Sequence, residues 1–399
     1  MSGNEMTLPK TADVVIIGGG IMGVSMAYYL ARRSAGRILV LEREVVGSGS
    51  TGRSVANVDL FSPQPAAARL QHYAYEIFAH FTERIGDDCG FVTTGTAVLA
   101  GSDQAAELQK AFATTLAAGI DVRLLRPAEF ADLEPAANVD DLASICYTPA
   151  GGYADPVLTL NAYVAAARSA GVMIQQGQPV TGLVQQGGRI TGVETKAGTI
   201  AAPLVVCAAG PWSGRLLQAF GLAGLGLSAA RHQVIAMQGV ANVDSPRLSI
   251  LDLAHSTYAR PDTGGLTVAG SLDPAVGNDP VEPDDQQQRV NPDYTFWVAE
   301  RLVQRYPMLE TAELRPGWSG LVSMSADFQP VLGRLPEVTG LYCTAGFSGG
   351  GFKISPAVGD LMAGLMTGEA EATKLLAPFR PARFAENEPL LSGGVVALG

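Results

Sequence analysis

Residues 13–42, DVVIIGGGIMGVSMAYYLARRSAGRILVLE, decide the fold of this chain. The apolar residues 14–17 are followed by glycines, a pattern typical of a strand buried on both faces of a parallel sheet. A helix is predicted over residues 21–33 and a second apolar strand over residues 37–41, directly before Glu42. The stretch therefore predicts a β-α-β unit about 30 residues long.

Three glycines, Gly18, Gly20 and Gly23, form the pattern G-x-G-x-x-G between the first strand and the helix. Gly18 permits a tight turn, Gly20 lets the backbone approach a pyrophosphate, and Gly23 lets the helix pack closely on the sheet. The helix N-terminus offers N–H groups and a partial positive charge to phosphates. Because Glu42 can accept hydrogen bonds from a ribose, the unit predicts a dinucleotide site; the alternative is an ordinary glycine turn.

The composition is that of a compact globular chain with two domains. Of the 399 residues, 47% are hydrophobic and 16% are charged, which is ample apolar material for two cores. The 38 acidic residues outnumber the 27 basic residues and give a net charge of −11. This excess of negative charge argues against non-specific binding to nucleic acids and to anionic membranes.

The four cysteines, Cys89, Cys146, Cys207 and Cys343, are scattered without a CxxC or other metal-like spacing. We expect buried, reduced thiols and no metal site. The N-terminal residues MSGNEMTLPK lack the pattern of a signal peptide, and no run of 18 apolar residues occurs. These features predict a cytoplasmic protein without a membrane span.

The order of predicted elements indicates a discontinuous domain organisation. Helices are predicted over residues 66–85, 103–118, 126–135, 155–170, 292–306 and 356–367. A strand over residues 205–207 returns the chain to the first sheet after an excursion. We expect a cofactor domain made of residues 1–85, 151–225 and 320–399, and a substrate domain made of residues 86–150 and 226–319.

Two loops rich in small residues are candidates for ligand contact. Residues 43–61 are rich in Gly and Ser, with Arg53 as the cation of the STGRS segment. The late loop AGFSGGGFKISPAVG, residues 345–359, carries Lys353, one of only five lysines beside 22 arginines. A buried ammonium needs an anion, whereas a surface lysine would extend its charge into water. Both interpretations of Lys353 are open at this point.

Six segments of the chain, in this order, resemble the flavin-dependent amine and amino-acid oxidoreductases related to D-amino acid oxidase, sarcosine oxidase and glycine oxidase. They are DVVIIGGGIMG with LER, STGRS, GGYADP, VVCAAGPWS, WSGLVSMSADFQPVLG and AGFSGGGFKISPAVG. The resemblance runs nearly end to end. It implies an α/β fold, in which an FAD-binding Rossmann-like domain carries an inserted substrate domain of mixed β-sheet and helices.

The resemblance also assigns residues to FAD. The glycine turn and Glu42 would hold the ADP half, Ser50 to Arg53 the pyrophosphate and flavin, and residues 349–352 the isoalloxazine. The full set implied at the cofactor is Gly18, Gly20, Gly23, Glu42, Arg43, Ser50, Thr51, Arg53, Val180, Ala209, Gly210, Trp212, Gly349, Gly350, Gly351, Phe352 and Lys353.

The implied activity is oxidation of the C–N bond of a small amino or imino acid. The substrate carboxylate would bind Lys353, a hydride would pass to flavin N5, and water would hydrolyse the resulting imine. Arg53 and Tyr258 are further candidate catalytic residues; Tyr258 and His255 could instead have buried structural roles. N-methyl, cyclic secondary and D-amino acids all remain candidate substrates, and no general base is identified.

Departures from the family pattern limit these expectations. Residues 318–327 contain no cysteine and Pro156 replaces a histidine, so we expect non-covalent FAD. Thr267 replaces an oxygen-activating lysine, which leaves oxygen and another electron acceptor equally open. Asn57 and Asp59 stand where a second substrate-binding arginine is expected, and Arg231 is a hypothetical replacement. The alternative function is a flavin-carrying electron-relay subunit of a multi-subunit dehydrogenase complex with partner subunits.

Overall fold

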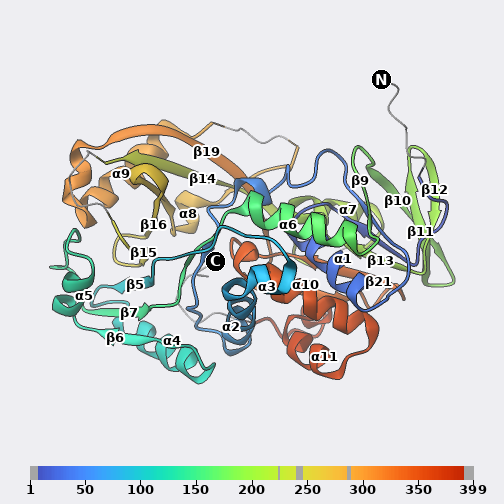
Figure 1. The fold of residues 1–399 in the computed structure, drawn as a ribbon, viewed down its shortest axis with the longest axis horizontal. Helices are drawn as coiled ribbons and strands as arrows, with labels where there is room; N and C mark the ends of the chain where they lie inside the picture. The colour runs from blue at the N-terminus through green and yellow to red at the C-terminus, as the bar shows by residue number, and fades with distance from the viewer. Residues whose placement is uncertain (1–7, 223–224, 240–245, 285–288, 391–399) are drawn as a thin grey trace.

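The computed structural model describes residues 8–222, 225–239, 246–284 and 289–390, and Figure 1 shows its ribbon. A central sheet of six strands has the order β20-β21-β13-β1-β2-β9. All neighbouring pairs are parallel except β20 and β21. Its strands are β1 (Val14–Ile17), β2 (Ile38–Leu41), β9 (Met173–Gln175), β13 (Leu204–Cys207), β20 (Val331–Arg334) and β21 (Leu341–Ala345).

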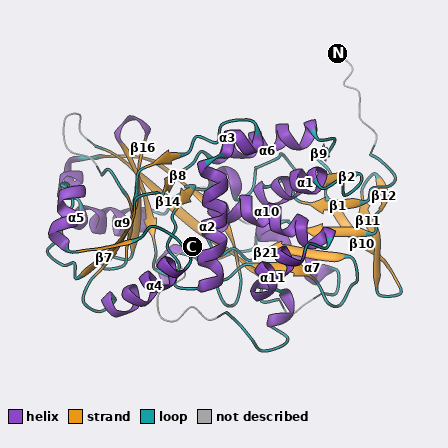
Figure 2. Cartoon of the chain, turned by 60° about the horizontal axis from the view of Figure 1, so that its bottom comes forward, coloured by secondary structure: helices purple, strands orange, loops and turns teal. Residues whose placement is uncertain are grey.

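The two faces of this sheet are covered by different layers, as Figure 2 shows. Val14 and Ile16 face a core shared with the helices, whereas Val15 and Ile17 face a second core. Successive side chains of a strand point to opposite faces, so β1 contributes to both cores. The helices on one face are α1 (Ile21–Arg32), α6 (Pro156–Ser169) and α10 (Gly351–Thr367); the opposite face is covered by β10 (Val180–Gln186), β11 (Arg189–Thr195) and β12 (Gly198–Ala201).

A nine-stranded mixed sheet forms the other half of the molecule (Figure 1). It follows the order β18-β14-β17-β16-β15-β5-β7-β6, and β19 pairs with β14. The strands are β5 (Thr96–Ala100), β6 (Arg123–Leu125), β7 (Ser144–Thr148), β14 (Ser228–Gln238), β15 (Ser249–Asp252), β16 (Thr257–Asp262), β17 (Leu266–Ser271), β18 (Asp279–Pro280) and β19 (Glu313–Met324).

One face of the nine-stranded sheet is covered by helix α9 (Pro292–Arg305). Ile235 and Met237 of β14 pack there with Tyr294, Val298 and Leu302 of the helix. The alternate residues of β14 consequently face the opposite side of the sheet.

The remaining α-helices and β-strands lie between these elements or follow them in the chain. They are α2 (Pro65–Ala79), α3 (Phe81–Ile85), α4 (Ala105–Ala117), α5 (Pro127–Leu133), α7 (Ser213–Ala219), α8 (Pro274–Gly277), α11 (Ala370–Leu376), β3 (Asn57–Val58), β4 (Val92–Thr93) and β8 (Gly152–Tyr153). The helix predicted over residues 66–85 is divided into α2 and α3 at His80. The predicted domain division stays a prediction, and β19 runs through the boundary that we placed after residue 319.

Helix α10 begins five residues earlier than the sequence predicts. We predicted a glycine loop followed by a helix from residue 356, but the helix begins at Gly351 and contains Pro356. A proline inside a helix leaves a carbonyl four residues earlier without its N–H donor. Here the Ser355 hydroxyl donates to that carbonyl, the oxygen of Phe352, at 2.8 Å. The residues that we expected in a loop, Gly351 to Lys353, therefore form the first turn of a helix.

Helices α1 and α10 pack closely along much of their length. A Cβ atom on Gly359 would lie 2.5 Å from the Ser25 hydroxyl and 2.9 Å from the Ser25 backbone carbon. The same hydroxyl donates to the carbonyl oxygen of Ser355 at 3.2 Å. The absent side chain at Gly359 is therefore what lets the two helices approach to backbone contact.

Substitution Gly359→Ala is expected to destabilise the protein by about 1–3 kcal/mol, because the new methyl group meets backbone atoms that cannot move aside. Helix propensity alone predicts the opposite, a gain of up to about 1 kcal/mol. Denaturant unfolding measures the difference. Gly101→Ala is the control, since its nearest neighbour is the flexible end of Gln104 at 3.3 Å. A Gly359→Ala variant as stable as the parent would contradict the packing argument.

Candidate functional site

A cavity of about 640 Å³ lies between the carboxyl ends of the central strands and the nine-stranded sheet. The residues that the family resemblance assigned to FAD or to catalysis line this cavity, with the exception of Gly23. The two weaker candidates, Arg231 and His255, do not line it. Their individual roles stay predictions. The wall also includes residues that the sequence analysis did not single out, among them Met22, Arg215, His232, Ser323 and Phe347.

The glycine turn has the geometry that its spacing predicts. Gly18 has a φ of 117°, and a Cβ atom there would lie 2.8 Å from the carbonyl carbon of Ala208. A Cβ atom on Gly23 would overlap the carbonyl oxygen of Gly18. Gly23 thus lies beneath the turn and supports it, which explains why it does not line the cavity.

Glu42 is bonded to the backbone of both loops that flank it. Its Oε2 accepts a hydrogen bond from the Gly19 N–H at 2.8 Å, and its Oε1 accepts one from the Glu44 N–H at 2.8 Å. A carboxylate has about four lone-pair positions, so these two bonds orient the group and leave acceptor capacity for a ligand hydroxyl.

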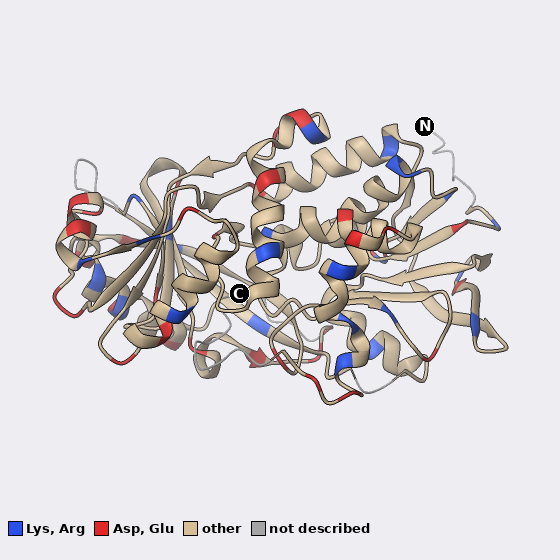
Figure 3. Ribbon diagram, turned by 90° about the horizontal axis from the view of Figure 1, so that it is seen from below, with Lys and Arg blue, Asp and Glu red and all other residues tan. Residues whose placement is uncertain are grey.

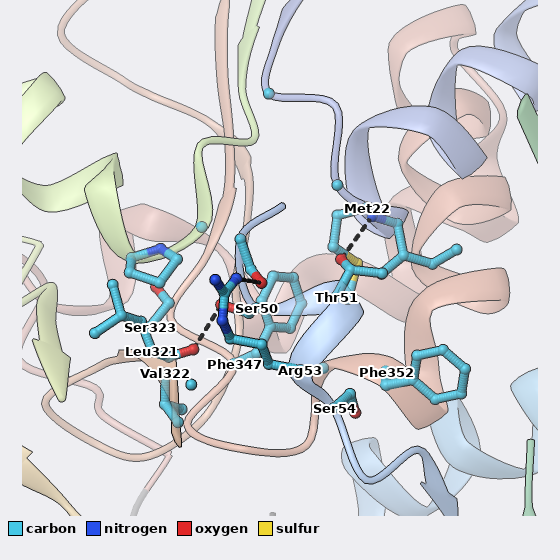
Figure 4. Close-up of a pocket in the computed structure, with 18 of the residues that line it drawn as sticks. Met22, Ser50, Thr51, Arg53, Ser54, Leu321, Val322, Ser323, Phe347 and Phe352 are labelled. Carbon is cyan, nitrogen blue, oxygen red and sulfur yellow. Dashed lines mark hydrogen bonds between the residues drawn. The ribbon is translucent and has the colours of Figure 1, made fainter. Parts of the chain in front are cut away.

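Two helix N-termini open on the same cavity. Helix α1 begins after Gly20 and α10 begins after Gly350, and both glycines line the wall. The Thr51 hydroxyl accepts the N–H of Ile21 at 3.1 Å in the first turn of α1 (Figure 4). Helix N-termini carry partial positive charge and exposed N–H groups, so this end of the cavity suits an anion.

The loop that carries Ser50 and Arg53 is attached to strand β19, as Figure 4 shows. The Ser50 hydroxyl donates to the carbonyl oxygen of Leu321 at 2.6 Å. The Trp318 indole N–H donates to the carbonyl oxygen of Arg53 at 2.9 Å. A Cβ atom on Gly320 would lie 2.9 Å from Arg53 Cβ, so this glycine makes room for the loop.

The guanidinium of Arg53 is bonded to its own loop. Its Nη1 donates to the carbonyl oxygen of Gly49 at 3.1 Å and to that of Ser48. The first role that the structure gives Arg53 is therefore to hold the turn over residues 48–50 in shape.

Arg43 and Trp212 meet at the edge of the cavity. The Arg43 guanidinium lies 4.3 Å above the Trp212 ring. Arg43 Nη1 and Trp212 Nε1 both donate to Asp284 at 2.8 Å, and Arg215 also pairs with this carboxylate. The hydrogen bonds from Trp212 and Arg43 lower the pKa of Asp284, so it is ionised at neutral pH.

The structure decides between the two interpretations of Lys353. It is a buried lysine, but its anion comes from within the chain, since Nζ donates to both oxygens of Asp59 at 2.9 and 2.8 Å. The side chains of Lys353 and Asp59 are only 4% and 2% exposed. A substrate carboxylate is therefore not needed to neutralise this ammonium. The acidic residue at position 59 was visible in the sequence, but its pairing across 294 positions was not.

Tyr258 and His232 form a polar pair on the wall made by the nine-stranded sheet. His232 Nε2 lies 3.0 Å from the Tyr258 hydroxyl oxygen, and both residues line the cavity. His232 was not among the site residues predicted from the sequence. The sequence did contain a signal for it. His232 is one of only four histidines in the chain, and it stands in a strand with apolar residues, two positions before Val234, which lines the same cavity.

Two other candidates, His255 and Arg231, lie outside the cavity wall and contact carboxylates there. His255 lies 3.2 Å from Asp141 and 3.3 Å from Asp252, beside the buried guanidinium of Arg305. A structural role for His255 agrees with this position but stays a prediction. Arg231 pairs with Asp279 at 2.6 Å.

Charged residues are distributed over both halves of the molecule (Figure 3). Among the described residues, no group of three or more His, Cys, Asp or Glu side chains is arranged to hold a metal ion. The four cysteines are buried and free, as predicted. In the same described residues, no helix has the length and apolar character that crossing a bilayer requires.

Comparison with known proteins identifies relatives of the whole fold. The chain is 28% identical to mitochondrial sarcosine dehydrogenase from Mus musculus over 90% of its own length, but spans only 40% of that protein. It is 28% identical to glycine oxidase from Geobacillus kaustophilus, covering 92% of this chain and 96% of the relative. The structure of L-proline dehydrogenase from P. horikoshii superposes with a TM-score of 0.87 and 25% identity, covering 96% of this chain and 100% of that one.

The sequence profile of one family, described as "DAO: FAD dependent oxidoreductase", matches residues 13–365. This range contains the glycine turn, the STGRS loop, the His232–Tyr258 pair and the first turn of α10. The three relatives named above are an oxidase and two dehydrogenases of amino acids, and the mixed α/β fold agrees with theirs. The chain therefore belongs to the DAO family of FAD-dependent oxidoreductases, and FAD is its cofactor.

Proposed function

We propose that this enzyme oxidises the C–N bond of a small N-methyl, cyclic secondary or D-amino acid, giving an imine that water hydrolyses. One observation carries the proposal: a single cavity joins the glycine turn and Glu42 to Lys353, Tyr258 and His232. A cavity of about 640 Å³ is within the range of small-molecule sites. In this proposal the dinucleotide occupies the part of the cavity lined by the glycine turn and Glu42, and the small acid lies beside Lys353 and Tyr258.

The residues present fit FAD held without a covalent bond. Gly18 and Gly20 line the cavity without side chains, and two helix N-termini face the same space. Glu42 would receive the ribose, and Gly349 to Phe352 would line the ring. When bound, FAD supplies the two-electron acceptor for the hydride that leaves the substrate carbon.

The chain itself would bind, orient and desolvate the substrate. The amine must be neutral, because its lone pair forms the C=N bond as the hydride leaves the adjacent carbon. Water then adds to this carbon and the C–N bond breaks. Lys353 is the proposed partner of the substrate carboxylate, which would share the ammonium with Asp59. Arg53 would contribute indirectly, because its guanidinium holds the turn over residues 48–50 in shape.

Relatives support this substrate class, since their names include sarcosine dehydrogenase, glycine oxidase and L-proline dehydrogenase. A second candidate is a flavin-carrying subunit that relays electrons within a larger complex. It is favoured by 26% identity, over 90% of this chain, to a mitochondrial pyruvate dehydrogenase phosphatase regulatory subunit from Mus musculus. An isolated chain that binds FAD but is reduced only with a co-purified partner would support the second candidate.

The purified protein is expected to carry FAD and to lose the flavin's visible absorption when mixed anaerobically with its substrate. Sarcosine, the two enantiomers of proline and several D-amino acids form the test panel. Readmitting air then separates an oxidase from a dehydrogenase by the rate of flavin reoxidation. Purified protein that takes up no FAD would rule out the proposal.

Flavin reduction is expected to accelerate with pH by about tenfold per unit below the substrate's amine pKa, because only the neutral amine can release a hydride. Stopped-flow absorbance at saturating substrate measures this profile. N-methylation changes the amine pKa, so the profile should shift with the substrate. A reduction rate that does not depend on pH would exclude this step.

Substitution Asp59→Asn is expected to strengthen binding of a simple carboxylate such as acetate by about tenfold or more, because the ligand then replaces the lost anion at Lys353. Lys353→Met should weaken the same binding and also destabilise the fold by about 3–5 kcal/mol, since it strands a buried carboxylate. Flavin difference spectra and denaturant unfolding report the two effects.

Two controls separate binding from stability in this experiment. Lys110→Met removes another paired lysine, but one that is exposed and bonded to Glu107, so neither effect is expected. The double variant Lys353→Met with Asp59→Leu should recover most of the lost stability without recovering carboxylate binding. Unchanged acetate affinity in Asp59→Asn would limit Lys353 to a structural role.

A further inference from the structure

The His232–Tyr258 pair is built across an intervening strand. His232 lies on β14 and Tyr258 on β16, and β17 runs between these two strands. Tyr258 is directly opposite Gly270 of β17 in the sheet register. A Cβ atom on Gly270 would lie 2.6 Å from Tyr258 Cζ, so only a glycine lets the phenol ring pass over this strand. The rings of Tyr258 and His232 then stack, with centroids 5.8 Å apart.

The hydrogen bonds of His232 determine which atom carries its proton. Nδ1 lies 2.8 Å from the carbonyl oxygen of Gly277, which can only accept. Nδ1 is therefore the protonated nitrogen of the neutral ring, and Nε2 is left as an acceptor. At 3.0 Å from Nε2, the Tyr258 hydroxyl must be the donor of their hydrogen bond.

Both groups keep these forms at neutral pH. Burial lowers the pKa of His232 below the ordinary histidine range, despite the bond to Gly277. Burial also raises the pKa of Tyr258 well above that of a free phenol. The ring is thus a neutral imidazole and the phenol keeps its proton, which excludes a phenolate acting as a base at this position.

We propose that His232 is a positioning residue, which turns the Tyr258 hydroxyl into a hydrogen-bond acceptor for the substrate's N–H group. The Tyr258 hydroxyl donates its only proton to His232 Nε2, so toward the cavity its oxygen can only accept a hydrogen bond. A substrate amine or imine N–H satisfies such an oxygen, whereas a carboxylate or ether oxygen does not. The inference rests on the proposed function. It adds that the Tyr258 oxygen selects ligands that carry an N–H group at this position.

Protonation of His232 would reverse the arrangement. Nε2–H would then donate to the Tyr258 oxygen and free the phenolic proton. The groups around the pair are Asp279 of β18, bonded to Arg231, Tyr294 of α9, and Arg260 of β16, bonded to Asp262. Both arginines lie in ion pairs with carboxylates, and Tyr294 donates to the carbonyl oxygen of Gln233 at 2.6 Å. His232 is accordingly the group whose titration changes the direction of this bond.

Two planar acids of nearly equal shape test the proposal with the FAD-loaded enzyme. Pyrrole-2-carboxylate carries an N–H where 2-furoate carries an ether oxygen. Flavin difference spectra give the dissociation constant of each without any turnover. The parent enzyme is expected to bind pyrrole-2-carboxylate about tenfold more tightly, the value of one hydrogen bond that the other ligand cannot make.

Substitutions and the pH dependence of this preference then distinguish the role of His232 from that of Tyr258. Tyr258→Phe should reduce the preference to about unity while keeping the ring. His232→Leu should reduce it as well, and His232→Gln should restore part of it, because its amide oxygen can accept the phenolic proton. In the parent the preference should fall as the pH drops below the ordinary histidine range, and in His232→Gln it should not depend on pH.

Equal affinity for the two acids in the parent, or a preference that survives in Tyr258→Phe, would overturn the inference while leaving amine oxidation intact. Failure of both acids to bind, together with a flavin that no amino acid reduces, would overturn the proposed function and this inference with it. Each variant must retain the parent's flavin spectrum, which confirms that the fold and the cofactor site are preserved.

Discussion

The close contact between helices α1 and α10 is the constraint on which the rest of this structure depends. Gly23 lets α1 lie against the carbonyl oxygen of Gly18, and Gly359 lets α10 lie against Ser25. Both contacts are too short for any side chain. Because the two helices are held side by side, their N-termini meet at one cavity, although they are more than 300 residues apart in sequence. The anion-binding end of the site is a consequence of this packing.

The cavity wall also contains polar groups that already have partners within the chain. Lys353 is paired with Asp59, and Tyr258 is bonded to His232. Burying such groups without partners would cost several kcal/mol each, so their pairing is required by the fold before any ligand arrives. The pairing also sets their chemistry: it reduces the net charge at Lys353 and gives the phenol of Tyr258 one direction of hydrogen bonding.

Local signals predicted the elements well where a single physical effect dominates. The apolar run Val14–Ile17 forms the predicted strand, and Asp155 caps α6 through its bonds to the N–H groups of Val157 and Leu158. The start of α10 was predicted wrongly because Pro356 usually marks the first turn of a helix. The Ser355 hydroxyl compensates for the missing N–H, and that bond depends on side-chain geometry that residue type does not reveal.

The sequence by itself determined the β-α-β unit, the family resemblance and most of the residues around the cavity, since glycine spacing and hydrophobic periodicity act over a few neighbouring residues. Only the tertiary structure decided that Asp59 neutralises Lys353 and that Gly270 lets Tyr258 reach His232. Those contacts join residues on separate elements, and the direction of a hydrogen bond depends on distances between atoms. No periodicity along the chain encodes them, because they arise when two sheets and two helices are packed around one space.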